Sequence, residues 1–334
     1  MIISRTPFRI SFFGGGTDYP AWYAENKGAV LATTINKYCY ITCRYLPPFF
    51  KHKFRIVYSK TELVKDISEI QHPAVRASLK YMKIKKGVEI HHDGDLPARS
   101  GLGSSSAFTV GLLHSLYALK GIMPTKRQLA LDALYLEQEV MKENVGSQDQ
   151  VLASFGGLNL IEFEGKHNFE LRPITIKPER LELLQKHLML FFTGIKRTAS
   201  RIAKEQIKRI PYKRRELKTM QEMVYRGLEI LTSNTDLSRF GKLLDEAWKI
   251  KRNLSNKISN PLIDEIYQAS KKAGAIGGKL LGAGGGGFIL IFASPGCHHK
   301  IRKKLKRFLY VPFRFENLGS QIIFYSPASL RKEI

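Results

Sequence analysis

One segment combines glycines and serines in a spacing suited to phosphate. Residues 97–107 read Pro-Ala-Arg-Ser-Gly-Leu-Gly-Ser-Ser-Ser-Ala. Glycines let a backbone approach phosphate closely and turn its N–H groups inward. A helix predicted to begin at the serines would add its N-terminal N–H groups and dipole, and serine hydroxyls can donate to phosphate or ligate magnesium. A Gly/Ser-rich turn that only caps a helix remains an alternative, and the segment is not a Walker loop because GxxxxGK[ST] is absent.

Two carboxylates stand out further along the chain. Glu139 lies on a helix predicted over Thr125–Asn144, and Asp149 lies just past its end, within Gly146–Gln150. Phosphoryl transfer depends on positioning and charge neutralisation, helped by a metal and by a group that handles the hydroxyl proton. On their own, Glu139 could be a solvated helix residue and Asp149 a helix-cap or turn residue.

A third carboxylate follows a glycine turn near the N-terminus. Ile2–Phe13 is predicted as a strand that ends at Gly14–Gly16, and Thr17 and Asp18 come next. A carboxylate in this place can accept hydrogen bonds from two hydroxyl groups of a ligand at once, or it can stabilise the turn.

Strands and helices must position these residues. In the first half, alternating and β-branched runs predict strands and capped periodic runs predict helices. The predicted elements there are strands Ile2–Phe13, Gly28–Tyr45, Lys53–Ser59 and Val88–His92, and helices Ser104–Lys120 and Thr125–Asn144.

The second half changes character. Its predicted elements are a strand at Leu188–Thr193, charged helices over about 198–255, a helix from Pro261 to Gly274, strands Lys279–Leu281 and Phe288–Ala293, a basic helix over about 296–308, and a strand Gln321–Tyr325. Strands first, followed by helices mixed with strands, predict an α+β protein. We expect two domains, residues 1–175 and 176–334.

The charge is strongly positive and uneven. The net charge is +25, with 20 Lys+Arg against 13 Asp+Glu in residues 1–150 and 34 against 16 in residues 151–334. Such a surface can attract anions, but the cations are scattered and no nucleic-acid-binding motif is present. Attraction of ATP and a phosphorylated substrate is a sufficient use, so we expect no nucleic-acid partner.

Composition also bounds the location. No run approaches the roughly 20 apolar residues of a membrane helix, and the N-terminus lacks a signal-peptide layout. The cysteines, Cys39, Cys43 and Cys297, include no tight pair, which argues against a disulfide framework or a zinc site. We expect a cytoplasmic protein with no membrane partner.

Three segments together carry a family resemblance. Pro97–Ala107 resembles the second motif of the GHMP kinases (galactokinase, homoserine kinase, mevalonate kinase and phosphomevalonate kinase), of the form P-x3-G-L-G-S-S-A. Pro7–Pro20 resembles their N-terminal motif, and Lys279–Phe288 resembles their C-terminal glycine motif. The resemblance implies an N-terminal domain like ribosomal protein S5 domain 2, a ferredoxin-like C-terminal domain, and substrates in the cleft between them.

The resemblance implies ATP and Mg²⁺ as cofactors and assigns roles. Ser105 and Glu139 become metal candidates, but the spacing from Glu139 to Asp149 is one residue shorter than in mevalonate kinase, which makes Glu137 a rival. Asp149 becomes a general base or a group that orients the hydroxyl. Arg9 becomes a cation near the transferred phosphoryl group, with a structural ion pair as the alternative. The residues implied to bind ATP are Pro97, Arg99, Ser100, Gly101, Leu102, Gly103, Ser104, Ser105 and Ser106.

The pattern G-G-G-T-D-x-P at Gly14–Pro20 resembles the corresponding motif of one subgroup of this family, the D-glycero-D-manno-heptose 7-phosphate kinases. Gly146–Gln150, with the glycine pair that follows it, and Phe192–Ser200 look the same way. This implies phosphorylation of the anomeric hydroxyl of heptose 7-phosphate to the 1,7-bisphosphate, for surface polysaccharide precursors. The implied substrate contacts are Gly15, Gly16, Thr17, Asp18, Arg197, Gly284 and Gly285.

Two of these contacts carry alternatives. Arg197 is expected at the distal phosphate, and it could instead be a solvated loop charge. The glycine run Gly282–Gly287, which includes Gly284 and Gly285, could contact nucleotide or substrate through its backbone. We expect it to be a tight strand connection packed against the Pro97 loop, with a secondary ligand role.

Other functions remain open on the sequence. A sugar 1-kinase for fucose or galactose is the nearest, because fucose kinases share parts of the pattern. A catalytically inactive GHMP-fold regulator is disfavoured because Asp149, Glu139, Ser105 and Arg9 are all present. Non-specific RNA binding through the net charge is a third alternative. A homodimer is left open.

Overall fold

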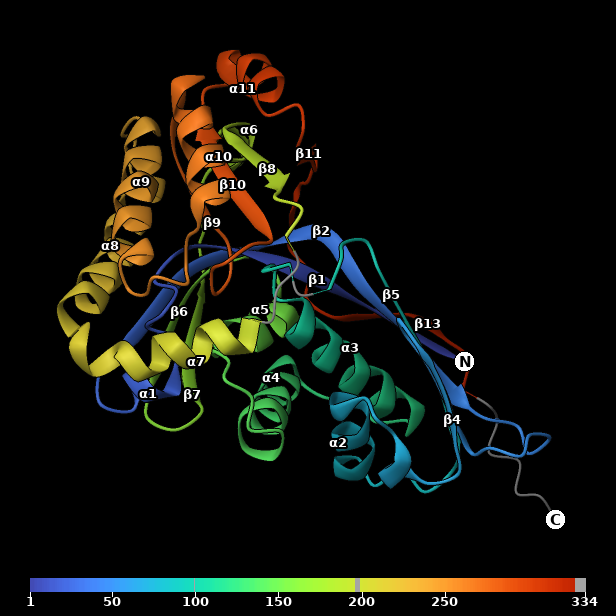
Figure 1. Ribbon diagram of the computed structural model, residues 1–334. Coiled ribbons are helices and arrows are strands. Elements are labelled where there is room, and N and C mark those ends of the chain that lie inside the picture. The colour runs from blue at the N-terminus through green and yellow to red at the C-terminus, as the bar shows by residue number, and fades with distance from the viewer. Residues whose placement is uncertain (99, 196–198, 328–334) are drawn as a thin grey trace.

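The computed structural model describes residues 1–98, 100–195 and 199–327, which form two β-sheets with helices around them (Figure 1). Over these residues, the larger sheet has nine strands and the smaller sheet has four. The larger sheet contains β1 (Ile2–Phe13), β2 (Gly28–Tyr45), β3 (Phe54–Val57), β4 (Thr61–Val64), β5 (Val88–Gly94), β6 (Leu158–Glu164), β7 (Asn168–Pro173), β12 (Phe315–Glu316) and β13 (Gln321–Tyr325). The smaller sheet contains β8 (Leu188–Phe192), β9 (Ala275–Leu280), β10 (Phe288–Ala293) and β11 (Leu309–Tyr310).

The 18-residue strand β2 organises the larger sheet. It pairs antiparallel with β1 along one edge, and its other edge pairs with β6 near its start and β5 near its end. The main order is β13-β1-β2-β5-β3-β4, and only the pairing of β3 with β5 is parallel among the described strands. Strand β1 pairs with β2 as far as Phe13 and ends there. The Gly14–Gly16 turn that follows therefore lies at one end of the sheet.

Helices cover both faces of the larger sheet (Figure 1). One face holds α2 (Pro73–Tyr81), α3 (Ser104–Leu119), α4 (Lys126–Leu134) and α5 (Gln148–Phe155). The smaller sheet lies beyond the opposite face, with α8 (Arg214–Thr232), α9 (Ser238–Arg252) and α10 (Pro261–Lys272). The remaining helices are α1 (Pro20–Tyr23), α6 (Pro178–Lys186), α7 (Ala199–Arg209) and α11 (His298–Lys304), with 3₁₀ turns at Ile67–Glu69, Ile210–Tyr212 and Pro295–Cys297 and a π-helix, η2, at Tyr135–Val140.

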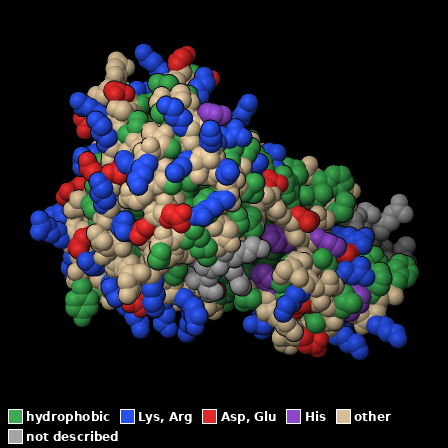
Figure 2. Space-filling model, turned by 45° about the horizontal axis from the view of Figure 1, so that its top comes forward, with side chains coloured by type: hydrophobic (Ala, Val, Ile, Leu, Met, Phe, Trp, Pro, Cys, Tyr) green, Lys and Arg blue, Asp and Glu red, His purple; other side chains and the backbone are tan. Residues whose placement is uncertain are grey.

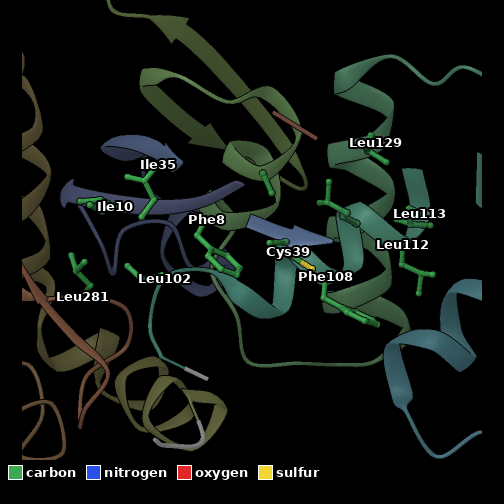
Figure 3. Packing of buried hydrophobic residues seen from close by; sticks show 14 of the residues in the cluster. Phe8, Ile10, Ile35, Cys39, Leu102, Phe108, Leu112, Leu113, Leu129 and Leu281 are labelled. Carbon is green, nitrogen blue, oxygen red and sulfur yellow. The ribbon is translucent and has the colours of Figure 1, made fainter. Parts of the chain in front are cut away.

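One apolar cluster joins the two sheets. It contains Phe8 and Ile10 of β1, residues of α3, and Phe288 and Phe292 of β10. Figure 3 labels two further members, Leu102 from the Pro97 loop and Leu281 just past the end of β9, in the same region as Ile10. Since both are fully buried, the loop is anchored in the core that the two sheets share.

Most predicted elements are present, and the differences have local causes. The helix predicted over Thr125–Asn144 ends as a π-helix at Val140. Strand β9 begins at Ala275 and not at the predicted Lys279. The prediction missed its first residues because the glycines there lack the β-branched side chains that are typical of strands. The hairpin β6–β7 and the helices α2 and α6 were not predicted; β6 finds its partner in β2, more than 120 residues earlier.

The chain crosses between the sheets more than once. After β11 it returns, so that β12 pairs with β2 and β13 with β1. The division at residues 175 and 176 remains a prediction. Within the described ranges, none of the helices has the length and apolar character needed to span a bilayer.

The space-filling view supports a scattered distribution of charge. Lys and Arg side chains spread over much of the face in Figure 2, with acidic side chains between them. Several ion pairs of this kind lie within single helices, such as Lys186 with Glu182 and Lys249 with Asp245. The excess of cations therefore forms a general positive field on this face and not a single basic stripe.

A close backbone approach between β9 and α9 gives the first prediction. A Cβ atom on Gly277 would overlap the carbonyl oxygen of Gly241. We expect Gly277→Ala to lower the free energy of unfolding by about 1–3 kcal/mol through overpacking, measured by thermal and urea denaturation. Gly296→Ala is the matched control, because its added Cβ would meet no described atom within 4 Å. Equal stability of the two variants would contradict the prediction.

Candidate active site

The Pro97 loop ends in the first turn of α3. Gly101 and Gly103 have φ values of 88° and 77°, which glycine adopts at little cost. Gly103 immediately precedes the helix, and no side chain caps its start in the described chain. The first N–H groups of an α-helix such as α3 have no acceptor within the helix, which is what an anion-binding turn requires. Arg99 lies outside the described residues.

The C-terminal glycine run supports this loop from behind. The Phe288 N–H donates to the carbonyl oxygen of Ser100 at 3.1 Å, and a Cβ on Gly287 would overlap the same oxygen. The Arg9 N–H donates to the carbonyl oxygen of Leu102 at 3.1 Å from the other side. The expected packing of the glycine run against the loop is therefore present in the structure.

Gly284 and Gly285 lie against a different segment. The Gly285 N–H donates to Ile258 at 2.8 Å, and the Gly285 carbonyl accepts from the Asn260 side chain at 3.2 Å. A Cβ on Gly284 would press on Ile258. Because the polar groups of Gly285 are already bonded within the protein, the structure gives no support to the predicted substrate contact at these two glycines.

Arg9 and Asp149 meet at the edge of the loop. Arg9 Nε donates to Asp149 Oδ1 at 2.6 Å and Arg9 Nη2 donates to Oδ2 at 2.8 Å. Arg9 Nη1 also donates to the carbonyl oxygen of Gly101 at 2.7 Å. The predicted position of Asp149 past a helix end becomes the first turn of α5. This two-point pairing fixes both side chains in direction as well as distance, and a Cβ on Gly103 would lie 3.3 Å from Asp149 Oδ2.

Asp18 lies close to the same place and is buried. Its carboxylate accepts from the Gly16 N–H and from Gln148 Nε2, both at 2.9 Å. Burial raises the pKa of Asp18, and the charge of Asp149 raises it further. A Cβ on Gly146 would overlap Asp18 Oδ2, so the turn before α5 needs glycine in order to approach this carboxylate.

Thr17 has a structural position. Its side chain is fully buried, with Oγ1 lying 2.9 Å from the carbonyl oxygens of Gly14 and Ala29 and accepting from the Ala29 N–H at 3.1 Å. The hydroxyl therefore fixes the glycine turn to β2. The structure therefore gives no support to a substrate contact through the Thr17 hydroxyl, and the predicted contact at Thr17 stays a prediction.

The two rival metal candidates lie on different sides of η2. Glu139 is exposed and pairs with His167 at 3.0 Å and Lys166 at 3.3 Å. Glu137 is 1% exposed, and Ser106 Oγ donates to its Oε2 at 2.8 Å. Glu137 and not Glu139 therefore lies beside the serine loop, which favours the rival candidate over the predicted one. Residues two apart on a helix point in different directions, so sequence spacing alone could not decide between them.

The burial of Glu137 and the unpaired oxygen of its carboxylate are features that a bound cation would compensate. Burial raises its pKa to about 7, and its Oε1 atom is buried without a hydrogen-bond partner in the described part of the chain. Ser105 is exposed in the same first turn of α3. The described residues contain no cluster of three His, Cys, Asp or Glu side chains suited to a metal, so an ion here would need ligands from a bound substrate as well, as magnesium commonly does.

Sequence reasoning missed two buried lysines near the glycine turn. Lys279 Nζ donates to the carbonyl oxygens of Ser11 and Phe12 at 2.9 and 2.8 Å, and burial lowers the pKa of Lys279 well below its usual value. Lys251 on α9 is 5% exposed and donates to Gly282. Because Lys279 lies within the C-terminal glycine motif, the sequence could have marked it as a site residue. Lys251 lies in a helix with many other charged residues, so no feature of the sequence marks it.

The predicted distal-phosphate residue cannot be placed. Arg197 lies outside the described residues. The described neighbour Gly194 has a φ of 80° at the end of β8, and Thr193 Oγ1 donates to the carbonyl oxygen of Gly287 at 2.9 Å. The segment that leads to Arg197 therefore starts directly beside the glycine run.

Comparisons with known proteins agree with this arrangement. The family model described as GHMP kinases N terminal domain matches residues 64–157, and that described as GHMP kinases C terminal matches residues 228–311. A D-glycero-alpha-D-manno-heptose 7-phosphate kinase of Campylobacter jejuni is 26% identical over 333 residues, which cover 92% of this chain and 93% of that protein. The bifunctional fucokinase/GDP-fucose pyrophosphorylase of Arabidopsis thaliana is 27% identical over 90% of this chain, which spans 30% of that longer protein.

A solved structure gives the same picture of the fold. The crystal structure of a D-glycero-D-manno-heptose 1-phosphate kinase from Bacteroides thetaiotaomicron aligns with a TM-score of 0.80 at 21% identity, covering 98% of this chain and 100% of that one. The predicted GHMP kinase fold is thereby confirmed. With both family models matched over just over half of its residues, the chain belongs to the GHMP kinases.

Proposed function

We propose that this protein transfers the γ-phosphoryl group of ATP to the anomeric hydroxyl of D-glycero-D-manno-heptose 7-phosphate. The product would be the 1,7-bisphosphate, a precursor for surface polysaccharide. The observation that carries the proposal is the Arg9–Asp149 pair at the edge of the phosphate loop, next to the buried carboxylate of Asp18. The similarity to the Campylobacter jejuni heptose 7-phosphate kinase supports the choice of sugar.

The proposed roles follow from where each group lies. The first N–H groups of α3 bind the nucleotide phosphates, because they have no helical partners. Arg9 stabilises the negative charge that develops on the transferred group. Asp149 accepts a hydrogen bond from the reacting hydroxyl, either orienting it or taking its proton. Asp18 accepts a hydrogen bond from another sugar hydroxyl at the glycine turn.

Glu137 would hold magnesium together with a serine of the loop. Ser105 was the predicted serine, and the bond from Ser106 to Glu137 makes Ser106 a second candidate. A bound magnesium ion would neutralise charge on the nucleotide phosphates. The ligands from the protein would then be one carboxylate and one hydroxyl, with the rest from phosphate and water.

A second function is favoured by a specific similarity. The fucokinase/GDP-fucose pyrophosphorylase and a galactokinase of Thermotoga neapolitana resemble this chain over 90% and 93% of its length, respectively. A sugar 1-kinase acting on an unphosphorylated sugar is therefore the alternative. An inactive regulator is disfavoured because Arg9 and Asp149 are both present and form an ion pair at the phosphate loop.

A substrate screen tests the proposal. Purified protein with ATP and magnesium is offered heptose 7-phosphate, mannose 6-phosphate, fucose and galactose, and ADP release is measured. We expect turnover of heptose 7-phosphate, with phosphorus NMR showing a new phosphate on the anomeric oxygen. Asp149→Asn, purified in parallel, should lose at least about 100-fold in kcat, which excludes a contaminating kinase. Preference for a free sugar would overturn the heptose assignment and leave the kinase assignment standing.

The metal role separates the two glutamates. We expect Glu137→Gln to raise the magnesium concentration needed for half-maximal activity by about 10-fold or more, because the buried carboxylate is lost. Glu139→Gln is the matched control and should behave like wild type, since its carboxylate pairs with His167 and Lys166 on the exposed side. Magnesium titrations that shift for Glu139→Gln and not for Glu137→Gln would reverse the assignment.

The distal phosphate is tested at Arg197. If its guanidinium binds that phosphate, Arg197→Ala should raise the KM for heptose 7-phosphate by about 10-fold or more and leave the KM for ATP unchanged. Arg239→Ala, at an exposed arginine of α9, controls for the loss of one positive charge. A wild-type KM for the sugar phosphate in Arg197→Ala would show that the residue is a solvated loop charge.

A further inference from the structure

Three polar side chains converge on the outer side of Gly15. A Cβ placed on Gly15 would have as its nearest neighbours Ser11 Oγ at 3.9 Å, Gln148 Nε2 at 4.0 Å and Lys251 Nζ at 4.0 Å. These atoms come from β1, α5 and α9, which are far apart in the sequence. The position above Gly15 is therefore bordered by hydrogen-bonding groups and not filled by apolar packing.

Two of these side chains carry atoms that the protein leaves unpaired. Ser11 Oγ and Gln148 Oε1 are buried and have no hydrogen-bond partner in the described chain. Ser11 is 5% exposed and Gln148 is 8% exposed. Buried polar atoms are nearly always paired in folded proteins, so each of these two atoms is available to a hydrogen-bonding group of a bound ligand.

Lys251 is directed to this place by the protein backbone. It lies in the last turn of α9, and its Nζ donates to the carbonyl oxygen of Gly282 at 2.6 Å. An ammonium group carries three donors, and this bond fixes the direction in which the ammonium group of Lys251 lies. A long lysine side chain is rarely buried to this degree unless a paired or functional group requires it.

The surrounding charges favour a ligand with both hydroxyl and anionic character. Desolvation lowers the pKa of Lys279, and the charges of Lys251 and Arg9 lower it further, while Asp18 opposes them. Lys251, Arg9 and Asp18 therefore all lie within electrostatic range of Lys279. Gln148 links the two kinds of group, because its Nε2 donates to Asp18 at 2.9 Å while its Oε1 stays unpaired.

We propose that Ser11, Gln148 and Lys251 form a subsite over Gly15 that binds a hydroxyl group of the acceptor sugar next to the one that reacts. This rests on the proposed function and names the residues that recognise its polyol substrate. Lys251 donates to the sugar oxygen, Gln148 Oε1 accepts from the sugar hydroxyl, and Ser11 Oγ completes the set. Because Asp149 directly follows Gln148 in α5, a sugar held at Gln148 is also held in register with the carboxylate that contacts the reacting hydroxyl.

Substitution of Lys251 tests the donor. We expect Lys251→Met to raise the KM and the calorimetric dissociation constant for the sugar by about 10- to 100-fold, the usual effect of losing a bond to a charged group, with the KM for ATP unchanged. Lys249→Met is the matched control on the same helix, where the lysine is 67% exposed and pairs with Asp245. It should bind the sugar like wild type.

Ser11→Ala separates ligand binding from folding. Because Ser11 Oγ has no partner in the described chain, removing it should leave the Tm unchanged or higher while weakening sugar binding by about 5-fold or more. A purely structural serine would give the opposite pattern, with a lower Tm and unchanged binding. This variant keeps the test decisive if Lys251→Met does not fold.

The outcomes distinguish the subsite from the function itself. Calorimetry uses heptose 7-phosphate and the sugar with the highest turnover in the screen, each without nucleotide. If wild type neither binds nor phosphorylates any of the sugars, both the proposed function and the subsite are overturned. If wild type binds a sugar and both Lys251→Met and Ser11→Ala bind it equally well, the subsite alone is overturned.

Discussion

The structure depends on a close backbone contact between the phosphate loop and the glycine run of the smaller sheet. Ser100 offers its carbonyl oxygen to the Phe288 N–H, and the approach is possible only because Gly287 has no side chain. The same contact brings Leu102 and Leu281 into one apolar cluster. The start of α3 is thus held between two sheets, so its first N–H groups are fixed by the core and do not depend on the ligand for their position.

That anchoring explains how so many charged groups are tolerated below the surface. Arg9 and Asp149 satisfy each other in a two-point pair, and Arg9 also bonds the loop at Gly101. Asp18 relies on an N–H of the glycine turn and on Gln148. Buried charges are costly unless they are paired or hydrogen-bonded. Among the buried atoms left unpaired in the described residues, Glu137 Oε1 belongs to a side chain bonded to Ser106 of the phosphate loop, and Ser11 Oγ borders Gly15. We expect substrates to supply the missing partners of these two atoms.

Prediction from the sequence succeeded where the signal was local. The glycine turns, the helix start at Ser104 and the strands β1, β2 and β10 were found from residue types and periodicity. It failed where an outcome depended on direction or on distant pairing. Glu137 and Glu139 occupy the same helical segment, and only the packing of η2 against the loop decides which of them faces it. Thr17 was predicted to contact the substrate, but its hydroxyl is hydrogen-bonded to the carbonyl oxygen of Ala29 in β2.

The sequence by itself determined the three glycine motifs, the α+β class and the membership of the GHMP kinases, because each is written in short runs whose conformational demands are local. Only the tertiary structure decided which side chains share a site. Ser11, Gln148 and Lys251 lie in three separate elements and meet at Gly15 because the two sheets close on one another. Lysine on a charged helix has no local feature that marks it as buried. Its role follows from the long-range packing of α9 against β9, which no short stretch of sequence encodes.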